Sequence, residues 1–121
     1  MIVALLDRKD SLHSKAVKLV EENIGSKFCI LGQIISETYS VIVRRCRERG
    51  YSCEESVEKV RMFEQRCLLI HADFNEYHDR IVEALKRNPK LNYNDWLLVL
   101  FSKEKNLKLL FLDRRLLEEV L

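Results

Sequence analysis

Glycine and proline are scarce in this chain of 121 residues, which contains only three glycines and one proline. An all-β sandwich or barrel needs a tight turn between successive short strands, and this composition cannot supply those turns. Hydrophobic residues make up 47% and charged residues 33%, a balance typical of a folded protein rather than a disordered chain. The length suits one domain, so we expect a single domain over residues 1–121 in which helices predominate.

The sequence also lacks the features of several other classes. No apolar run reaches the roughly 18 to 20 residues that a membrane span requires, and charge follows the first six residues, where a signal peptide would remain apolar. The net charge of +2 is too small a bias to indicate nucleic-acid or membrane binding by itself. The four cysteines form no CxxC pair and have no histidine at zinc-finger spacing. We expect a cytoplasmic protein without a membrane partner.

What the chain does contain is an alternation of short apolar runs and longer amphipathic segments. Residues 28–31, 67–72 and 107–112 are compact apolar runs that predict strands, the last of them central and well covered. Residues 1–6 are equally apolar and are ambiguous between a strand and a short helix. Apolar residues recur at helical spacing between these runs, and three side chains are candidate helix caps: Ser52, Asp73 and Asn92.

Short strands that alternate with amphipathic helices are typical of a parallel sheet covered by helices on both faces. The sequence therefore predicts the α/β class, as a three-layer α/β/α fold with a short parallel sheet.

Three carboxylates fall where a strand gives way to a helix. Glu37 lies in the first turns of the helix after residues 28–31, Asp95 lies near the start of a buried helix, and Asp113 directly follows residues 107–112. The carboxyl ends of parallel strands share one edge, where ligands bind, so these acids can converge. Clustered carboxylates repel each other unless a divalent cation such as Mg²⁺ or Mn²⁺ neutralises them, and such a site hydrolyses phosphodiesters. Taken singly, each acid is also explained by the stabilising effect of negative charge in a first helical turn.

Three stretches resemble the PIN domains, and among them the VapC-like toxin ribonucleases of prokaryotic toxin–antitoxin pairs. They are ALLDRKDSLHSKAVKLV at residues 4–20, IISETYSVIVRR at residues 34–45 and LNYNDWLLVLFSKEKNLKLLFLDRRL at residues 91–116. The resemblance spans nearly the whole chain. It implies a PIN-like fold and a metal-dependent endoribonuclease, a hydrolase that acts on RNA.

The same resemblance assigns the acids position by position. Glu37 matches the family's second acid, Asp95 its third, and Asp113 the fourth or supporting acid. It further implies a divalent cation, an antitoxin protein that occupies a groove on the helices before and after Gly50, and assembly of the chain into a homodimer.

Two departures from the family bear on activity. PIN domains begin with a central strand that ends in an Asp, usually within a DTN or DTS motif, and that motif would lie before Met1, so we expect a domain that lacks the first strand and the first catalytic Asp. The threonine or serine of the family's T-x-D motif appears as Phe111. If residues 1–6 formed the central strand, Asp7 would stand at its end as a replacement metal ligand, whereas alignment with the family implies a short helix there. Alternatively, the chain is a shortened form of a longer protein.

Basic residues are the remaining signal, and they crowd the end of the helix that carries Glu37: Arg44, Arg45, Arg47 and Arg49. Contacts with phosphates would give RNA affinity that falls with salt, although cations at a helix C-terminus also complement the helix dipole. The leading hypothesis is thus a PIN-like ribonuclease, the toxin of a type II pair. The alternative is an inactive PIN-like domain that binds RNA or a protein partner. A receiver-type signalling module would need an acidic pair that Asp7 and Asp10 do not provide well.

Overall fold

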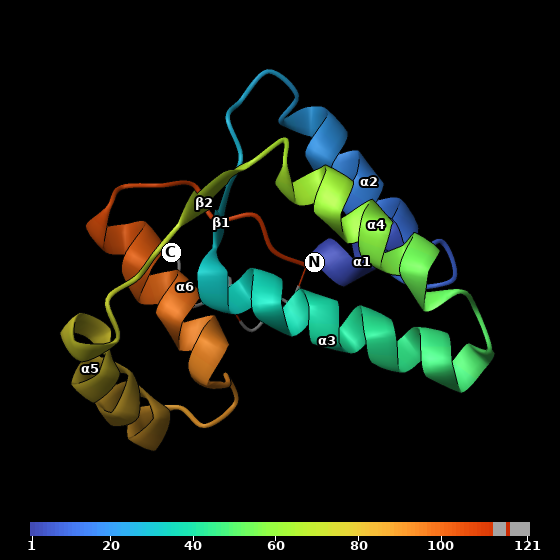
Figure 1. The fold of residues 1–121 in the computed structure, drawn as a ribbon. Helices are drawn as coiled ribbons and strands as arrows, with labels where there is room; N and C mark the ends of the chain where they lie inside the picture. Colours follow the sequence, from blue (N-terminus) through green and yellow to red (C-terminus); the bar gives the residue numbers. More distant parts are fainter. Residues whose placement is uncertain (113–115, 117–121) are drawn as a thin grey trace. The chain divides into compact units, whose positions relative to one another are not determined.

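The computed structural model describes residues 1–112 and Leu116, and the chain divides into two compact units. The first unit is Met1–His71 and the second is Ala72–Leu121. The course of each is shown as a ribbon coloured along the sequence (Figure 1), and each unit is described by itself. The expectation of a single domain over residues 1–121 stays a prediction.

The first unit contains a two-stranded parallel sheet. Strand β1 (Cys29–Leu31) pairs with β2 (Leu68–Ile70), with Cys29 opposite Leu68 and Leu31 opposite Ile70. Both strands fall inside apolar runs that predict strands, and their pairing is parallel as the alternating pattern indicates. The α/β class with a short parallel sheet is confirmed, in a chain that is otherwise mostly helical.

Four helices accompany this sheet. They are α1 (Ile2–Leu6), α2 (His13–Glu22), α3 (Gly32–Arg49) and α4 (Cys53–Glu64). In Figure 1, α3 leaves the end of β1 as the longest helix, and α4 returns beside it.

The turn between α3 and α4 is determined by local sequence. Gly50 ends α3 with a φ of 72°, a left-handed conformation that glycine adopts without a steric penalty. Ser52 then accepts a hydrogen bond from the amide of Glu55 and so caps the start of α4. The two helices are also joined near the sheet, where the Tyr39 hydroxyl donates to the Glu64 carboxylate.

Apolar residues of β1, α3 and α4 form the core of the first unit. Its buried members are Ile30, Ile35, Ile42, Cys46 and Val60. Three side chains of α1 pack against this cluster: Ile2, Val3 and Leu6. Helix α1 is therefore attached to the unit through its apolar face.

The second unit is built on two helices that pack together, α5 (Phe74–Arg87) and α6 (Tyr93–Glu104). Asp73 caps α5 by accepting a hydrogen bond from the amide of Asn75. The largest fully buried side chains of this unit are Tyr77, Ile81, Leu91, Trp96 and Val99. Trp96 therefore contributes to the core, as the apolar character of its segment indicates.

Of the two forms that the sequence left open for residues 1–6 the structure shows the helix, and the strand predicted for residues 107–112 is wrong. Residues 1–6 do not form a strand, because Ile2–Leu6 is a helix and Asp7 follows a helix. Residues 107–112 have no regular structure, and Leu107 is 43% exposed rather than covered. An apolar run becomes a strand only when another strand offers it hydrogen-bond partners, and in the described part of the chain β1 and β2 pair only with each other. None of the described helices has the length and hydropathy that a membrane span requires.

Candidate functional site

Glu37 occupies the second turn of α3, the helix that begins at the end of β1. Its side chain is exposed. The next residue, Thr38, is buried, and its hydroxyl donates to the carbonyl of Ile34 at 2.9 Å. The helix thus turns Thr38 toward the core and Glu37 toward the surface, as the period of 3.6 residues requires.

Asp95 is held at the start of α6 by a reciprocal pair of hydrogen bonds. The amide of Asp95 donates to Asn92 Oδ1 at 2.9 Å, and the amide of Asn92 donates to Asp95 Oδ2 at 3.0 Å. This capping box satisfies two backbone amides at the helix terminus. The Asp95 carboxylate is half-buried and fixed in orientation, and a carboxylate oxygen has room for further partners.

The structure does not bring the predicted metal ligands together within one described unit. Asp113 lies outside the described residues. Glu37 belongs to the first unit and Asp95 to the second. Within residues 1–112 and Leu116, no group of three or more His, Cys, Asp or Glu side chains is arranged to hold a metal ion. The assignment of these acids as metal ligands stays a prediction.

Asp7 is the acid whose surroundings the structure defines best. Its Oδ2 atom accepts hydrogen bonds from Arg45 Nη1 at 2.8 Å and from Arg49 Nη1 at 2.7 Å. Its Oδ1 atom accepts one from the amide of Lys9 at 3.1 Å. Arg45 Nη1 also reaches Asp10 Oδ2 at 2.8 Å. These four side chains, Asp7, Asp10, Arg45 and Arg49, are called the ion-pair cluster below.

The ion-pair cluster keeps its acids ionised. Burial raises the pKa of the Asp7 carboxyl, but the hydrogen bonds from Arg49 and Arg45 outweigh that effect and lower this pKa from 3.8 to about 2. The amide of Leu12 and the guanidinium of Arg45 lower the pKa of Asp10 as well. A divalent cation at Asp7 would stand beside two guanidinium groups that repel it. Asp7 is therefore left out of the ligand set proposed below.

Sequence reasoning missed the ion-pair cluster. Its acids and its arginines are 35 to 42 residues apart in the chain, and no local pattern joins such distant positions. The available signal was the coincidence of two acids at Asp7 and Asp10 with a run of arginines before Gly50. Two members of that run, Arg44 and Arg47, are exposed and lie outside the ion-pair cluster.

Aromatic side chains form a small stack in the second unit. The rings of Phe74 and His78 are stacked with centroids 4.4 Å apart, and His78 Nδ1 is 3.0 Å from the Tyr93 hydroxyl. Arg87 lies over the Trp96 ring at 5.2 Å from its centroid. This cation–π contact gives Arg87 a packing role at the surface of the buried indole.

Comparison with known proteins identifies the family. The family model described as PIN domain matches residues 1–120, which is nearly the whole chain. Searches of curated proteins and of solved structures found no match. The chain belongs to the PIN-domain family. Membership indicates nuclease activity in general, and PIN domains generally use divalent metals.

Proposed function

We propose that this protein is a metal-dependent ribonuclease that hydrolyses RNA phosphodiester bonds. The observation that carries the proposal is the match of the PIN-domain model to residues 1–120. Within that match, Glu37, Asp95 and Asp113 stand at the positions where the sequence resembles the acidic motifs of the family. We assign these three carboxylates as the metal ligands.

The donor chemistry of this set suits a hard divalent cation. All three side chains offer carboxylate oxygens, which Mg²⁺ and Mn²⁺ prefer over nitrogen or sulfur. When bound, such a cation supplies positive charge that polarises the phosphodiester and lowers the pKa of a water molecule. Asp95 is suited to hold a cation in one orientation, because the capping box with Asn92 restricts the rotation of its carboxylate.

Cleavage of a mixed RNA substrate with Mg²⁺ or Mn²⁺ tests this proposal. We expect metal-dependent cleavage by the wild type and a loss of about 100-fold or more in each of Glu37→Gln, Asp95→Asn and Asp113→Asn, since each removes a charged ligand. Glu48→Gln is the matched control, because Glu48 is an exposed acid of the same helix as Glu37. Equal cleavage by wild type and Asp95→Asn, or cleavage that persists in EDTA, would contradict the proposal.

A second candidate function is favoured by one observation. Asp7, the acid that could replace the family's first one, is engaged by Arg45 and Arg49 rather than placed at a strand end. A PIN-like domain with an incomplete set of acids would bind RNA or a protein partner without cleaving it. Binding of the same RNA, measured by a separate titration, together with the absence of metal-dependent cleavage would support this candidate.

The biological setting that we propose is the toxin of a type II toxin–antitoxin pair, acting on RNA in the cytoplasm as a homodimer. The resemblance to VapC-like toxins supports this setting. Induced expression in a bacterial host should slow growth with the wild type and not with Asp95→Asn, and light scattering should give twice the mass of 14.4 kDa. Growth arrest by both proteins would contradict the toxin role, and a monomer would contradict the dimer.

A further inference from the structure

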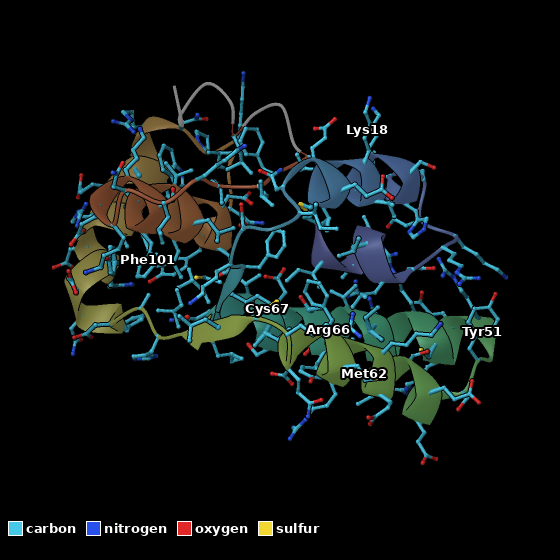
Figure 2. All side chains as sticks on the ribbon, turned by 90° about the horizontal axis from the view of Figure 1, so that it is seen from above. Lys18, Tyr51, Met62, Arg66, Cys67 and Phe101 are labelled. Atoms are coloured by element: carbon cyan, nitrogen blue, oxygen red, sulfur yellow. The ribbon has the colours of Figure 1, made fainter. Side chains whose placement is uncertain are left out.

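The first unit contains a pocket whose lining does not include Glu37, the metal ligand proposed in this unit. It lies between the residues that follow α1, the last turns of α3 and the first turns of α4. Figure 2 shows one of its lining residues, Tyr51, at the end of the α3–α4 pair that is remote from Cys67 and the strands. Arg49 in its wall is twelve residues along α3 from Glu37, which corresponds to about 18 Å of helix.

Cationic side chains dominate the polar wall of this pocket. Five of them line it: Arg8, Lys9, Arg45, Arg49 and Lys59. The carboxylates that meet them are Asp7, in the wall, and Asp10, which binds Arg45. The local surplus of three positive charges exceeds the formal charge of +2 on the whole chain. Such a concentration of positive charge in a recess attracts anions.

The cations are held in place before any ligand arrives. Asp7 fixes Arg45 and Arg49 through hydrogen bonds of 2.8 and 2.7 Å. A guanidinium carries five N–H donors, so both arginines keep donors that can bind a ligand. Lys9 is held by Tyr51, with Nζ 4.6 Å from the ring centroid and hydrogen-bonded to the hydroxyl. Side chains that are already ordered lose less entropy when they bind a ligand.

The pocket also has an apolar part and room for a ring. Leu6, Ile42 and Cys46 line it beside the cations, and Tyr51 adds an aromatic wall. Its volume is about 180 Å³. A protein cavity of about 150 Å³ admits benzene, so a ring of comparable size fits here. An anion that carries a ring therefore matches the pocket better than a small inorganic anion does.

We propose that this pocket binds one nucleotide unit, with its phosphate among the cations and its base or ribose against the apolar wall. Arg49 and Lys59 contact the phosphate, and the ring lies near Tyr51, Ile42 and Leu6. The source of the unit is either a free mononucleotide or one residue of an RNA chain. RNA as the source rests on the proposed function, whereas affinity for a mononucleotide does not.

The test is a two-dimensional amide NMR titration of the full chain in EDTA with 5′-UMP, with uridine and with inorganic phosphate. We expect 5′-UMP to shift signals of residues 6–9, 45–51 and 56–59, and to bind more weakly as salt rises. Uridine, which lacks the phosphate, should bind at least about tenfold more weakly. Inorganic phosphate that binds as well as 5′-UMP would overturn the assignment of a ring, and the absence of shifts at these residues would overturn the site.

Variants locate the ligand in this pocket. Lys59→Gln changes an exposed lysine and should weaken 5′-UMP binding about fivefold. The slope of log affinity against log salt concentration should also fall by about 1, because one contact with the phosphate is lost. Arg49→Gln should weaken it similarly and leaves the ion pair between Asp7 and Arg45 in place. Arg47→Gln is the matched control, since Arg47 is exposed on the same helix and does not line the pocket. Equal weakening by Arg47→Gln and Lys59→Gln would overturn the proposal, because it would show a diffuse charge effect.

A labelled single-stranded RNA distinguishes the two sources. If Lys59→Gln weakens the binding of RNA together with that of 5′-UMP, the pocket receives a nucleotide of RNA. If RNA binding is unchanged while 5′-UMP binding is weakened, the ligand is a free nucleotide. Because these titrations contain EDTA, a failure of metal-dependent cleavage would contradict the proposed function and leave the pocket assignment intact.

Discussion

At the scale of single residues, Asp7 shows how much depends on contacts that are distant in sequence. Its position after six apolar residues is compatible with a metal ligand at a strand end. In the structure it follows helix α1 and accepts hydrogen bonds from two arginines 38 and 42 residues away. A local pattern predicts the type of a segment, but it carries no information about which distant charges will surround an acid. The sequence therefore shows the acids and the arginines of the ion-pair cluster, but not that they pair with each other.

The depressed pKa of Asp7 gives a prediction about acid stability. The pKa is about 2 in the folded chain and near 3.9 in an unfolded one, so Asp7 stabilises the fold above about pH 4 and this contribution is lost as the pH falls toward 2. Asp7→Asn should lower the free energy of unfolding by about 1 to 2 kcal/mol at pH 7. The measurement is urea unfolding of both proteins between pH 7 and pH 3.

The diagnostic result is the pH dependence of that difference. It should be constant from pH 7 to about pH 5 and become smaller below pH 4. Asp79→Asn is a suitable control, because Asp79 is an exposed acid on α5. A difference between wild type and Asp7→Asn that does not change with pH would mean that the carboxylate charge is not what stabilises the folded chain.

At the scale of helices and strands, the sequence was informative wherever the determinants are local. Ser52, Asp73 and Asn92 all cap helices as their sequence context predicts, because a cap bonds to amides two or three residues away. The run at residues 107–112 shows the converse. Its composition suits a strand, yet a strand also requires a neighbour, and that neighbour is not encoded in the run itself.

The capping box of α6 gives a prediction at this scale. Asn92→Ala removes the acceptor for the Asp95 amide and should lower the free energy of unfolding by about 1 kcal/mol. Asp95→Asn keeps an oxygen that can accept a hydrogen bond from the Asn92 amide. It should therefore lower the free energy of unfolding clearly less than Asn92→Ala does. Thermal unfolding followed by circular dichroism measures both. If Asp95→Asn is the more destabilising of the two, the carboxylate has a structural role that complicates its use as a test of catalysis.

At the scale of the whole molecule, the proposed ligands are drawn from both compact units. Glu37 belongs to the first unit and Asp95 to the second. The sequence indicated these acids through their positions after strands and at helix starts, and through the family resemblance. Their spatial relation depends on how the units pack, which periodicity and caps do not encode. Metal binding that uses both acids would be a property of the complete chain rather than of either unit.

Metal binding should accordingly stabilise the whole fold. At about 100 times its Kd, a cation that binds only the folded chain raises the free energy of unfolding by about 2.7 kcal/mol. We expect Mg²⁺ or Mn²⁺ to raise the Tm of the wild type and of Glu48→Gln, and to leave the Glu37→Gln/Asp95→Asn double variant unchanged. Sodium chloride at matched ionic strength controls for screening. A similar rise in the double variant would show that the cation binds elsewhere.

The ion-pair cluster has a consequence for the order of events during synthesis. Asp7 leaves the ribosome long before Arg49, its partner 42 residues later. At roughly 5 to 20 residues per second, this interval lasts about 2 to 8 seconds. During it, core residues of β1 and α3 such as Ile30 and Ile42 follow Asp7 one after another, and Val60 of α4 follows only after Arg49, so the apolar face of α1 is not yet fully covered. Closure of the ion-pair cluster is thus a late step of synthesis, because it waits for the residues up to Arg49 at the end of α3.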